Sequence, residues 1–397
     1  MEYGREVLVR LKREVEASAK DGKVIFAGHR GCGKSTLLKR FSVEMREKYF
    51  SIFFSIADLI EMSDVSHVNI LYAIGLKLLS NASKVNIPVP EDIKQSLLGW
   101  TNTTHKETIG ETTKSEAGVG QSDIFKLITI KLQQERTFRD ELERTYQKKI
   151  SELVRNIDRL AAAIQISTKK PVLVIIDDLD KLDLSIIEPI YRNNVKALFS
   201  PGFKIVFTIP ISAIQEPKVM GALNSEGIVR SQLFPVTKFY PRQDCRNPNA
   251  QPISKSLNLF QEILKKRFPP ELLTPESAEK MILSSGGVVR ELVRIGRECC
   301  TECMVQLEIE PDRENIKIDE EILATALRNL RNDFARQISS SQLYTMLAEV
   351  YQTLKPTEGE AFVKLLHGLM VLEYENDALW YDVHPIIIEL LHREKLI

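Results

Sequence analysis

The sequence lacks any long run of uncharged apolar residues. A helix that spans a bilayer needs about 20 such residues, and the 397-residue chain contains no stretch of this kind. The opening segment, MEYGREVLVRLKRE, carries charges where a signal peptide has its apolar region. We therefore expect a cytoplasmic protein with no membrane partner.

An excess of charge of one sign is also missing. Lys and Arg together number 54, as do Asp and Glu, so the chain as a whole has no charge that would draw it to nucleic acid or to a membrane surface. The 43% hydrophobic and 27% charged residues are typical of a globular protein. The length predicts two or three domains.

Cysteine is scarce, and the spacing of the five cysteines is not that of a disulfide framework. Three of them, Cys299, Cys300 and Cys303, lie close together on a predicted helix. Zinc would need a fourth ligand there, and no neighbouring His or Cys provides one. We therefore expect these three cysteines to be small buried residues.

What the chain does contain is a glycine-rich stretch, KVIFAGHRGCGKST, at residues 23–36. Its apolar residues 24–27 predict a buried strand, and the helix-like run 37–41 follows. The pattern G-x-x-x-x-G-K-[ST] between a strand and a helix is typical of a phosphate-binding loop. The glycines let backbone N–H groups turn inward around a phosphate, at the positive end of the new helix.

Each residue type in this loop has a predicted role. The Lys34 ammonium would reach the β- and γ-phosphates, and the Ser35 hydroxyl would hold Mg²⁺. The residues that we expect to contact the nucleotide are Gly28, His29, Arg30, Gly31, Cys32, Gly33, Lys34, Ser35 and Thr36.

A second diagnostic stretch, VLVIIDD, occupies residues 172–178. Five apolar residues followed by two acids predict a central parallel strand with carboxylates at the end where α/β sheets bind ligands. Asp177 would hold Mg²⁺ opposite Ser35, and Asp178 would orient or deprotonate the attacking water. The alternative is that acids here cap the next helix, as Asp180 or Asp183 could.

Residues 82–166 separate the early strands from this one and predict an insertion into the core. Residues 82–122 are polar and Thr-rich and predict a loop. Residues 123–166 predict one long helix, packed as a coiled coil or helical hairpin because apolar residues recur at near-heptad spacing. The alternative is a helix that lies against the core. The spaced residues are Leu142, Tyr146, Ile150, Leu153, Ile157, Leu160 and Ile164.

Further strands are predicted at residues 51–56, 203–209 and 233–236, and the chain is helical from about residue 252. Helices followed by a hairpin at 371–374 and 379–382, with residues 375–377 as its turn, favour a winged helix. We predict a core over residues 1–250 that includes the insertion, a helical lid over 251–318, and a winged-helix-like domain over 319–397.

With these motifs the whole chain resembles an AAA+ type P-loop ATPase, near the initiator-like and the STAND/KAP-like groups. The resemblance implies an α/β parallel-sheet core, an all-α lid, bound ATP and Mg²⁺, and ATP hydrolysis. It also implies that Thr208 is the sensor-1 residue, that Arg290 in SGGVVREL approaches the phosphates as sensor 2, and that Arg230 is an arginine finger acting in a neighbouring subunit.

Three departures keep the subfamily open. Typical AAA+ ATPases have Asp-Glu where this chain has Asp177-Asp178, and this pair looks more like STAND and KAP proteins. STAND proteins usually place an Arg where Thr208 stands, and the usual KAP membrane insertion is absent.

The expected function is an ATP-dependent switch that recruits a partner or forms an oligomer, through the insertion helix or the C-terminal domain. Family analogy alone suggests prokaryotic defence or signalling. A DNA-handling initiator or loader is one alternative, but residues 320–397 hold 7 Lys and Arg against 12 Asp and Glu, which repel phosphates. A nucleotide-sensing scaffold with negligible hydrolysis is the other.

Overall fold

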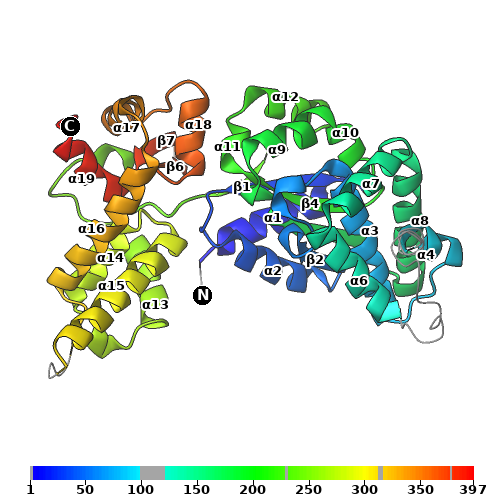
Figure 1. The fold of residues 1–397 in the computed structure, drawn as a ribbon, viewed down its shortest axis with the longest axis horizontal. Coiled ribbons are helices and arrows are strands. Elements are labelled where there is room, and N and C mark those ends of the chain that lie inside the picture. Colours follow the sequence, from blue (N-terminus) through cyan, green and yellow to red (C-terminus); the bar gives the residue numbers. More distant parts are fainter. Residues whose placement is uncertain (1–2, 99–120, 229–230, 312–315, 376–377) are drawn as a thin grey trace. The chain divides into compact units, whose positions relative to one another are not determined.

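The computed structural model describes residues 3–98, 121–228, 231–311, 316–375 and 378–397 (Figure 1). The chain forms two compact units, each taken separately below. One comprises Met1–Arg5, Gly28–Lys34 and Phe234–Ile397, and is called the C-terminal unit here. The other comprises Glu6–Ala27 and Ser35–Leu233, and is called the sheet unit.

The sheet unit is built on strands in the order β2-β3-β4-β1-β5. The strands are β1 (Lys23–Gly28), β2 (Phe50–Ser55), β3 (Val172–Asp177), β4 (Lys204–Pro210) and β5 (Gln232–Phe234). β3 pairs in parallel with both β2 and β4. Every residue of β3 and β4 is buried, as expected of central strands, and most residues of both strands are apolar. The predicted α/β parallel-sheet core is confirmed.

Helices cover this sheet. They are α1 (Arg5–Ala17), α2 (Lys34–Met45), α3 (His67–Lys84), α4 (Glu91–Leu98), α6 (Gln121–Gln134), α7 (Arg136–Gln147), α8 (Ile150–Thr168), α9 (Leu184–Glu188), α10 (Val195–Leu198), α11 (Ile211–Ile214) and α12 (Pro217–Ser225), with short turns η1 (Ile56–Asp58), η2 (Met62–Asp64), η3 (Leu179–Lys181) and η4 (Pro189–Asn193). α3 is buried almost all round because it packs against α7, α8 and α10. No helix in the described ranges has the length and apolar character needed to cross a membrane.

The expected structure of residues 82–166 is partly wrong. The helix α4 lies inside the predicted loop, and residues 123–166 form parts of three helices rather than one. Arg139 explains the break between α6 and α7: it is buried, donates to the carbonyls of Leu132 and Gln133 at the end of α6, and pairs with Asp64 at 2.6 Å. The chain can turn there because these carbonyls have a partner.

The near-heptad apolar residues of this segment pack into the main core. Leu142, Leu153, Leu160 and Ile164 belong to the same buried cluster as the strand residues. This is the arrangement expected of helices that lie against the core. A coiled coil is not confirmed.

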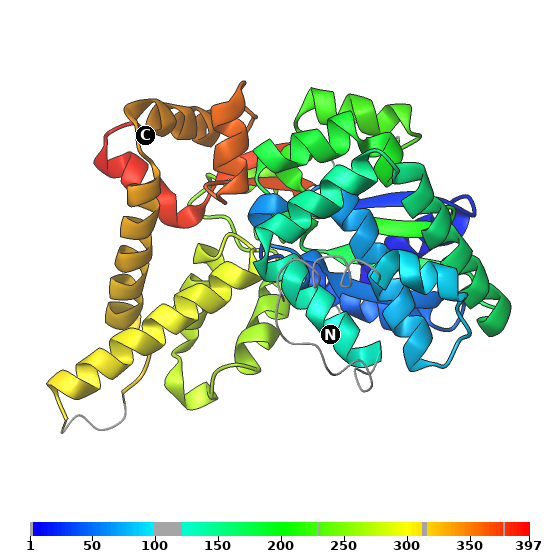
Figure 2. The same ribbon diagram turned by 45° about the vertical axis from the view of Figure 1, so that its right-hand side comes forward.

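The C-terminal unit is largely helical. It contains α13 (Ser254–Lys265), α14 (Pro275–Ser284), α15 (Val289–Ile309), α16 (Glu320–Gln337), α17 (Ser341–Thr353), α18 (Glu360–His367) and α19 (Pro385–Arg393), with short turns η5 (Arg242–Asp244) and η6 (Pro270–Leu272). Ser or Thr side chains cap α14 and α17, and Asp319 caps α16. The long helices α15 and α16, yellow and gold in Figure 2, pack on each other.

The predicted hairpin is present in this unit. Its strands, β6 (Val371–Glu375) and β7 (Leu379–Val383), pair antiparallel with Tyr374 opposite Trp380 and Leu372 opposite Asp382. Two of the three predicted turn residues, Asn376 and Asp377, lie outside the described residues. Whether the helices and this hairpin form a winged helix is not confirmed and stays a prediction.

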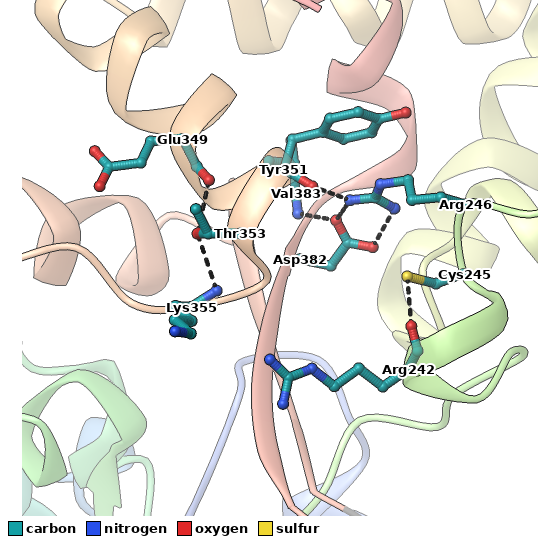
Figure 3. Close-up of polar contacts among 9 residues, drawn as sticks. All are labelled: Arg242, Cys245, Arg246, Glu349, Tyr351, Thr353, Lys355, Asp382 and Val383. Carbon is teal, nitrogen blue, oxygen red and sulfur yellow. Dashed lines mark hydrogen bonds and ion pairs between the residues drawn. The ribbon is translucent and has the colours of Figure 1, made fainter.

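A polar cluster anchors β7 to its surroundings (Figure 3). The Arg246 guanidinium donates to both carboxylate oxygens of Asp382 and to the carbonyl of Tyr351, and it stacks on the Tyr351 ring at 3.7 Å. Burial raises the pKa of Asp382, and the charge and hydrogen bonds of Arg246 oppose that shift. The pair joins the segment before α13 to the hairpin and to α17.

Candidate functional site

The glycine-rich loop joins β1 to α2, and its glycines adopt conformations that other residues rarely reach. Gly28, Gly31 and Gly33 have φ values of 154°, 86° and 94°. A Cβ atom on Gly31 would lie 2.5 Å from the Cβ of Arg290. Both the backbone turn and the close packing therefore require glycine in this loop.

The predicted phosphate-binding lysine lies within the loop. Lys34 is buried, and its ammonium donates to the carbonyls of Gly28 and His29 at 2.8 and 2.7 Å. The loop thus wraps around a positive charge, which is the arrangement that favours an anion next to it.

His29 has a contact that its place in the loop motif did not predict. Its Nε2 accepts a hydrogen bond from the backbone N–H of Glu373 in β6, at 2.8 Å. Burial, and to a smaller extent the charge of Lys34, lowers the pKa of His29 to about 3. The imidazole is therefore neutral, with its proton on Nδ1, which has no hydrogen-bond partner among the described residues.

Tyr3 supports the loop from the start of the chain. Its hydroxyl donates to the carbonyl of the buried Cys32 at 2.6 Å, and its ring lies 5.5 Å from that of Phe234. Burial raises the pKa of Tyr3, so the phenol remains a donor. No sequence motif that we used assigns Tyr3 this role.

Arg290, the predicted sensor-2 residue, lies beside the same loop. Its backbone N–H donates to the Gly31 carbonyl at 3.0 Å, and its side chain packs on Gly31 while remaining exposed. The preceding turn is tied to the hairpin, because the Tyr374 hydroxyl donates to the Gly286 carbonyl at 2.8 Å. The C-terminal unit thus brings the loop, the start of α15 and the hairpin together.

In the sheet unit, Asp177 ends β3 and pairs with Ser35, the residue after Lys34. The two side chains are hydrogen-bonded, and Asp177 is 2% exposed. The pKa of Asp177 is raised to about 6, mainly by burial and also by the charges of Asp178 and Asp180, while the Ser35 hydrogen bond opposes this shift. The Asp177 Oδ1 atom has no hydrogen-bond partner in the described part of the chain.

These oxygen atoms fit a divalent cation. Ligand atoms of Asp177, Asp178 and Asp180 lie within 4.8 Å of one another, and carboxylate and hydroxyl oxygens suit Mg²⁺. The metal role of Ser35 and Asp177 stays a prediction. Asp180, for which the sequence suggested a possible capping role, is buried in this cluster.

Asp178, the predicted base, is held by two neighbours. It has a left-handed backbone with φ 68°. Its Oδ2 accepts from the Ser55 hydroxyl at 2.6 Å, and its Oδ1 lies 2.7 Å from the Lys181 ammonium. Both contacts hold the Asp178 carboxylate in place just before η3.

Thr208, the predicted sensor-1 residue, is fully buried in β4. Its hydroxyl donates its proton to the Ile176 carbonyl at 3.1 Å and accepts from the Leu179 N–H at 3.0 Å. In this structure Thr208 therefore positions the end of β3 and the turn η3. The predicted arginine finger, Arg230, lies outside the described residues.

Comparison with known proteins places this site in a family. The model of the KAP family P-loop domain matches residues 19–216, about half of the chain. No curated protein matches the sequence. One solved structure that resembles the chain is titled "Structure of Drosophila ORC bound to DNA", with 11% identity, a TM-score of 0.35, and coverage of 98% of this chain and 85% of that one. A score this low supports no argument. The match over residues 19–216, together with the glycine-rich loop and the acidic end of β3, shows that this chain carries the P-loop NTPase domain of the KAP family.

Proposed function

We propose that this P-loop domain binds ATP with Mg²⁺, hydrolyses it, and acts as a switch whose nucleotide state controls a protein partner or self-association. The observation that carries the proposal is the hydrogen bond between Ser35 and Asp177, directly after the loop that surrounds Lys34. This hydrogen bond would put the residues of a cation site directly after those of a phosphate site in the sequence.

The role of each group follows from its chemistry. Lys34 and the loop N–H groups would bind the β- and γ-phosphates, and Ser35 with Asp177 would hold Mg²⁺. When bound, Mg²⁺ would neutralise phosphate charge. Arg290 is exposed at the loop, where a guanidinium can pair with phosphate oxygens.

The contacts of the loop favour a switch over a simple hydrolase. The loop is hydrogen-bonded to the hairpin through His29 and to the start of α15 through Gly31. A phosphate that changes the loop would therefore act on both elements. The lid at 251–318, the winged-helix-like domain at 319–397 and the core at 1–250 remain our proposed domains.

A scaffold that senses nucleotide without hydrolysing it is the second candidate. It is favoured because Ser55 and Lys181 contact the two Asp178 oxygens, and a general base needs an oxygen that can contact the attacking water. A DNA-handling role is not favoured, since the end of β6 carries the exposed Glu375.

Two assays on size-separated fractions test these proposals. One measures the binding of a fluorescent ATP analogue, and the other measures ATP turnover. Lys34→Ala should abolish binding, whereas Lys39→Ala on the exposed side of α2 should not. Turnover in an oligomeric fraction that disappears in Arg230→Ala, with binding kept, supports a shared site. Tight binding without turnover supports the scaffold, and unchanged binding by Lys34→Ala refutes the nucleotide proposal.

A further inference from the structure

A groove lies on the C-terminal unit where α14, α16 and α19 pack on one another (Figure 1). Its volume is about 570 Å³, which is within the range of pockets that hold small molecules. None of the described residues that line it belongs to the glycine-rich loop or to the acidic end of β3. We call it the arginine groove, because Arg328 and Arg331 of α16 line it.

Arg331 carries the most buried charge that lines the arginine groove. Its side chain is 11% exposed and forms an ion pair with one carboxylate oxygen of Glu389 in α19. The other oxygen of Glu389 lies 3.1 Å from the Arg393 guanidinium. One carboxylate is therefore shared between two guanidinium groups. The Arg331 Nε–H has no acceptor among the described residues, so Glu389 satisfies this guanidinium only in part.

Arg328 adds a third positive charge. It lies one turn before Arg331 on the same face of α16, is exposed, and forms no ion pair within the described part of the chain. Burial lowers the pKa of Arg331, and the nearby charges of Arg393 and Arg328 also lower it, while Glu389 opposes this shift. Three guanidinium groups around one carboxylate leave an excess of two positive charges.

The other charges on the groove do not cancel this excess. Lys280 of α14 is paired with Glu320 at 2.9 Å. Glu321 also lines the groove, but it lies two turns before Arg328, about 10 Å away along the helix axis. Salt screens exposed charges over a similar distance, so Glu321 offsets little of the positive charge beside Glu389.

We propose that the arginine groove binds a small soluble molecule through a terminal phosphate monoester. Such a group carries a charge close to −2 at neutral pH, which matches the excess of two positive charges. Guanidinium groups also suit phosphate oxygens, because they can donate two parallel hydrogen bonds. The phosphodiester of a nucleic acid fits less well, since it carries one charge and the exposed Glu321 and Glu389 would repel the neighbouring phosphates.

Isothermal titration calorimetry of the full chain with phenyl phosphate is the test. Methyl phenyl phosphate, a diester with one negative charge, should bind at least tenfold more weakly than phenyl phosphate. Arg328→Gln should weaken the binding of phenyl phosphate at least tenfold. Arg336→Gln is the matched control and should leave it unchanged, because Arg336 is an exposed arginine of the same helix that pairs with Asp333 and does not line the groove.

Glu389→Gln separates a binding role from a structural one. It removes the acid that competes with a phosphate for Arg331 and Arg393, so the affinity for phenyl phosphate should rise at least threefold. Without ligand, the melting temperature of this variant should be lower than that of the wild type, because both guanidinium groups lose their partner. Phenyl phosphate should then raise it by more than it raises that of the wild type.

The glycine-rich loop is itself a proposed phosphate site, so each comparison is repeated with Lys34→Ala in the background, where the same ratios are expected. The proposal is overturned if the wild type binds no phenyl phosphate, or if its binding disappears with Lys34→Ala alone. It is also overturned if Arg328→Gln binds within threefold of the wild type, or if Glu389→Gln does not bind more tightly. A short DNA duplex that binds the wild type but not Arg328→Gln, when phenyl phosphate does not bind, would make the groove a nucleic-acid site instead.

Discussion

Replacing His29 by glutamine should remove one contribution to the loss of stability of this protein in acid. His29 is 1% exposed, and its Nε2 accepts from the Glu373 N–H. The glutamine side-chain oxygen can reach a similar position and accept the same bond, but it does not take up a proton near neutral pH. The variant therefore keeps the contact and removes the titration.

The sign and size of the effect follow from the pKa of His29, lowered from 6.5 to about 3 by burial and by the charge of Lys34. The unfolded chain takes up a proton as the pH falls below 6.5, whereas the folded chain does not until near pH 3, so stability falls across this window. Each pH unit corresponds to about 1.4 kcal/mol. Between pH 7 and pH 5 the wild type should lose about 2 kcal/mol more than His29→Gln.

Urea unfolding at the two pH values measures this difference, with the fluorescence of Trp380 on β7 as one probe. His29→Phe is the matched control, because it removes the acceptor and leaves the Glu373 N–H unpaired. That variant should be destabilised by about 1–3 kcal/mol at both pH values. Equal losses in the wild type and in His29→Gln would refute a neutral, buried His29.

Three further predictions concern other contacts. Thr208→Val removes the acceptor for the first amide of η3, and it should lower the free energy of unfolding by about 1–3 kcal/mol in urea titrations. Gly31→Ala places a Cβ against Arg290 at a φ of 86°, so the affinity for an ATP analogue, measured by fluorescence titration, should fall at least tenfold. Asp382→Ala removes the carboxylate that pairs with the half-buried Arg246, and this should lower the stability by about 2–4 kcal/mol. The double variant Arg246→Met with Asp382→Ala should recover part of that loss, as measured by thermal unfolding.

Local sequence was enough to predict the glycine-rich loop and β3. The loop requires glycine at defined positions, and an unbroken apolar run that ends in acids has few other structures available to it. The three helices α6, α7 and α8 could not be predicted as separate, because the buried Arg139 that ends α6 pairs with Asp64, 75 residues earlier. A periodicity pattern contains no information on such a partner.

By itself, the sequence determined the α/β class, the phosphate loop and the pair of Ser35 and Asp177, because these depend on residues close together in short motifs. That His29 contacts a strand 344 residues later, and that Lys181 pairs with Asp178, could be seen only in the tertiary structure. Burial and neighbouring charge set the protonation and the ligand role of a side chain, and both arise only when distant segments pack together.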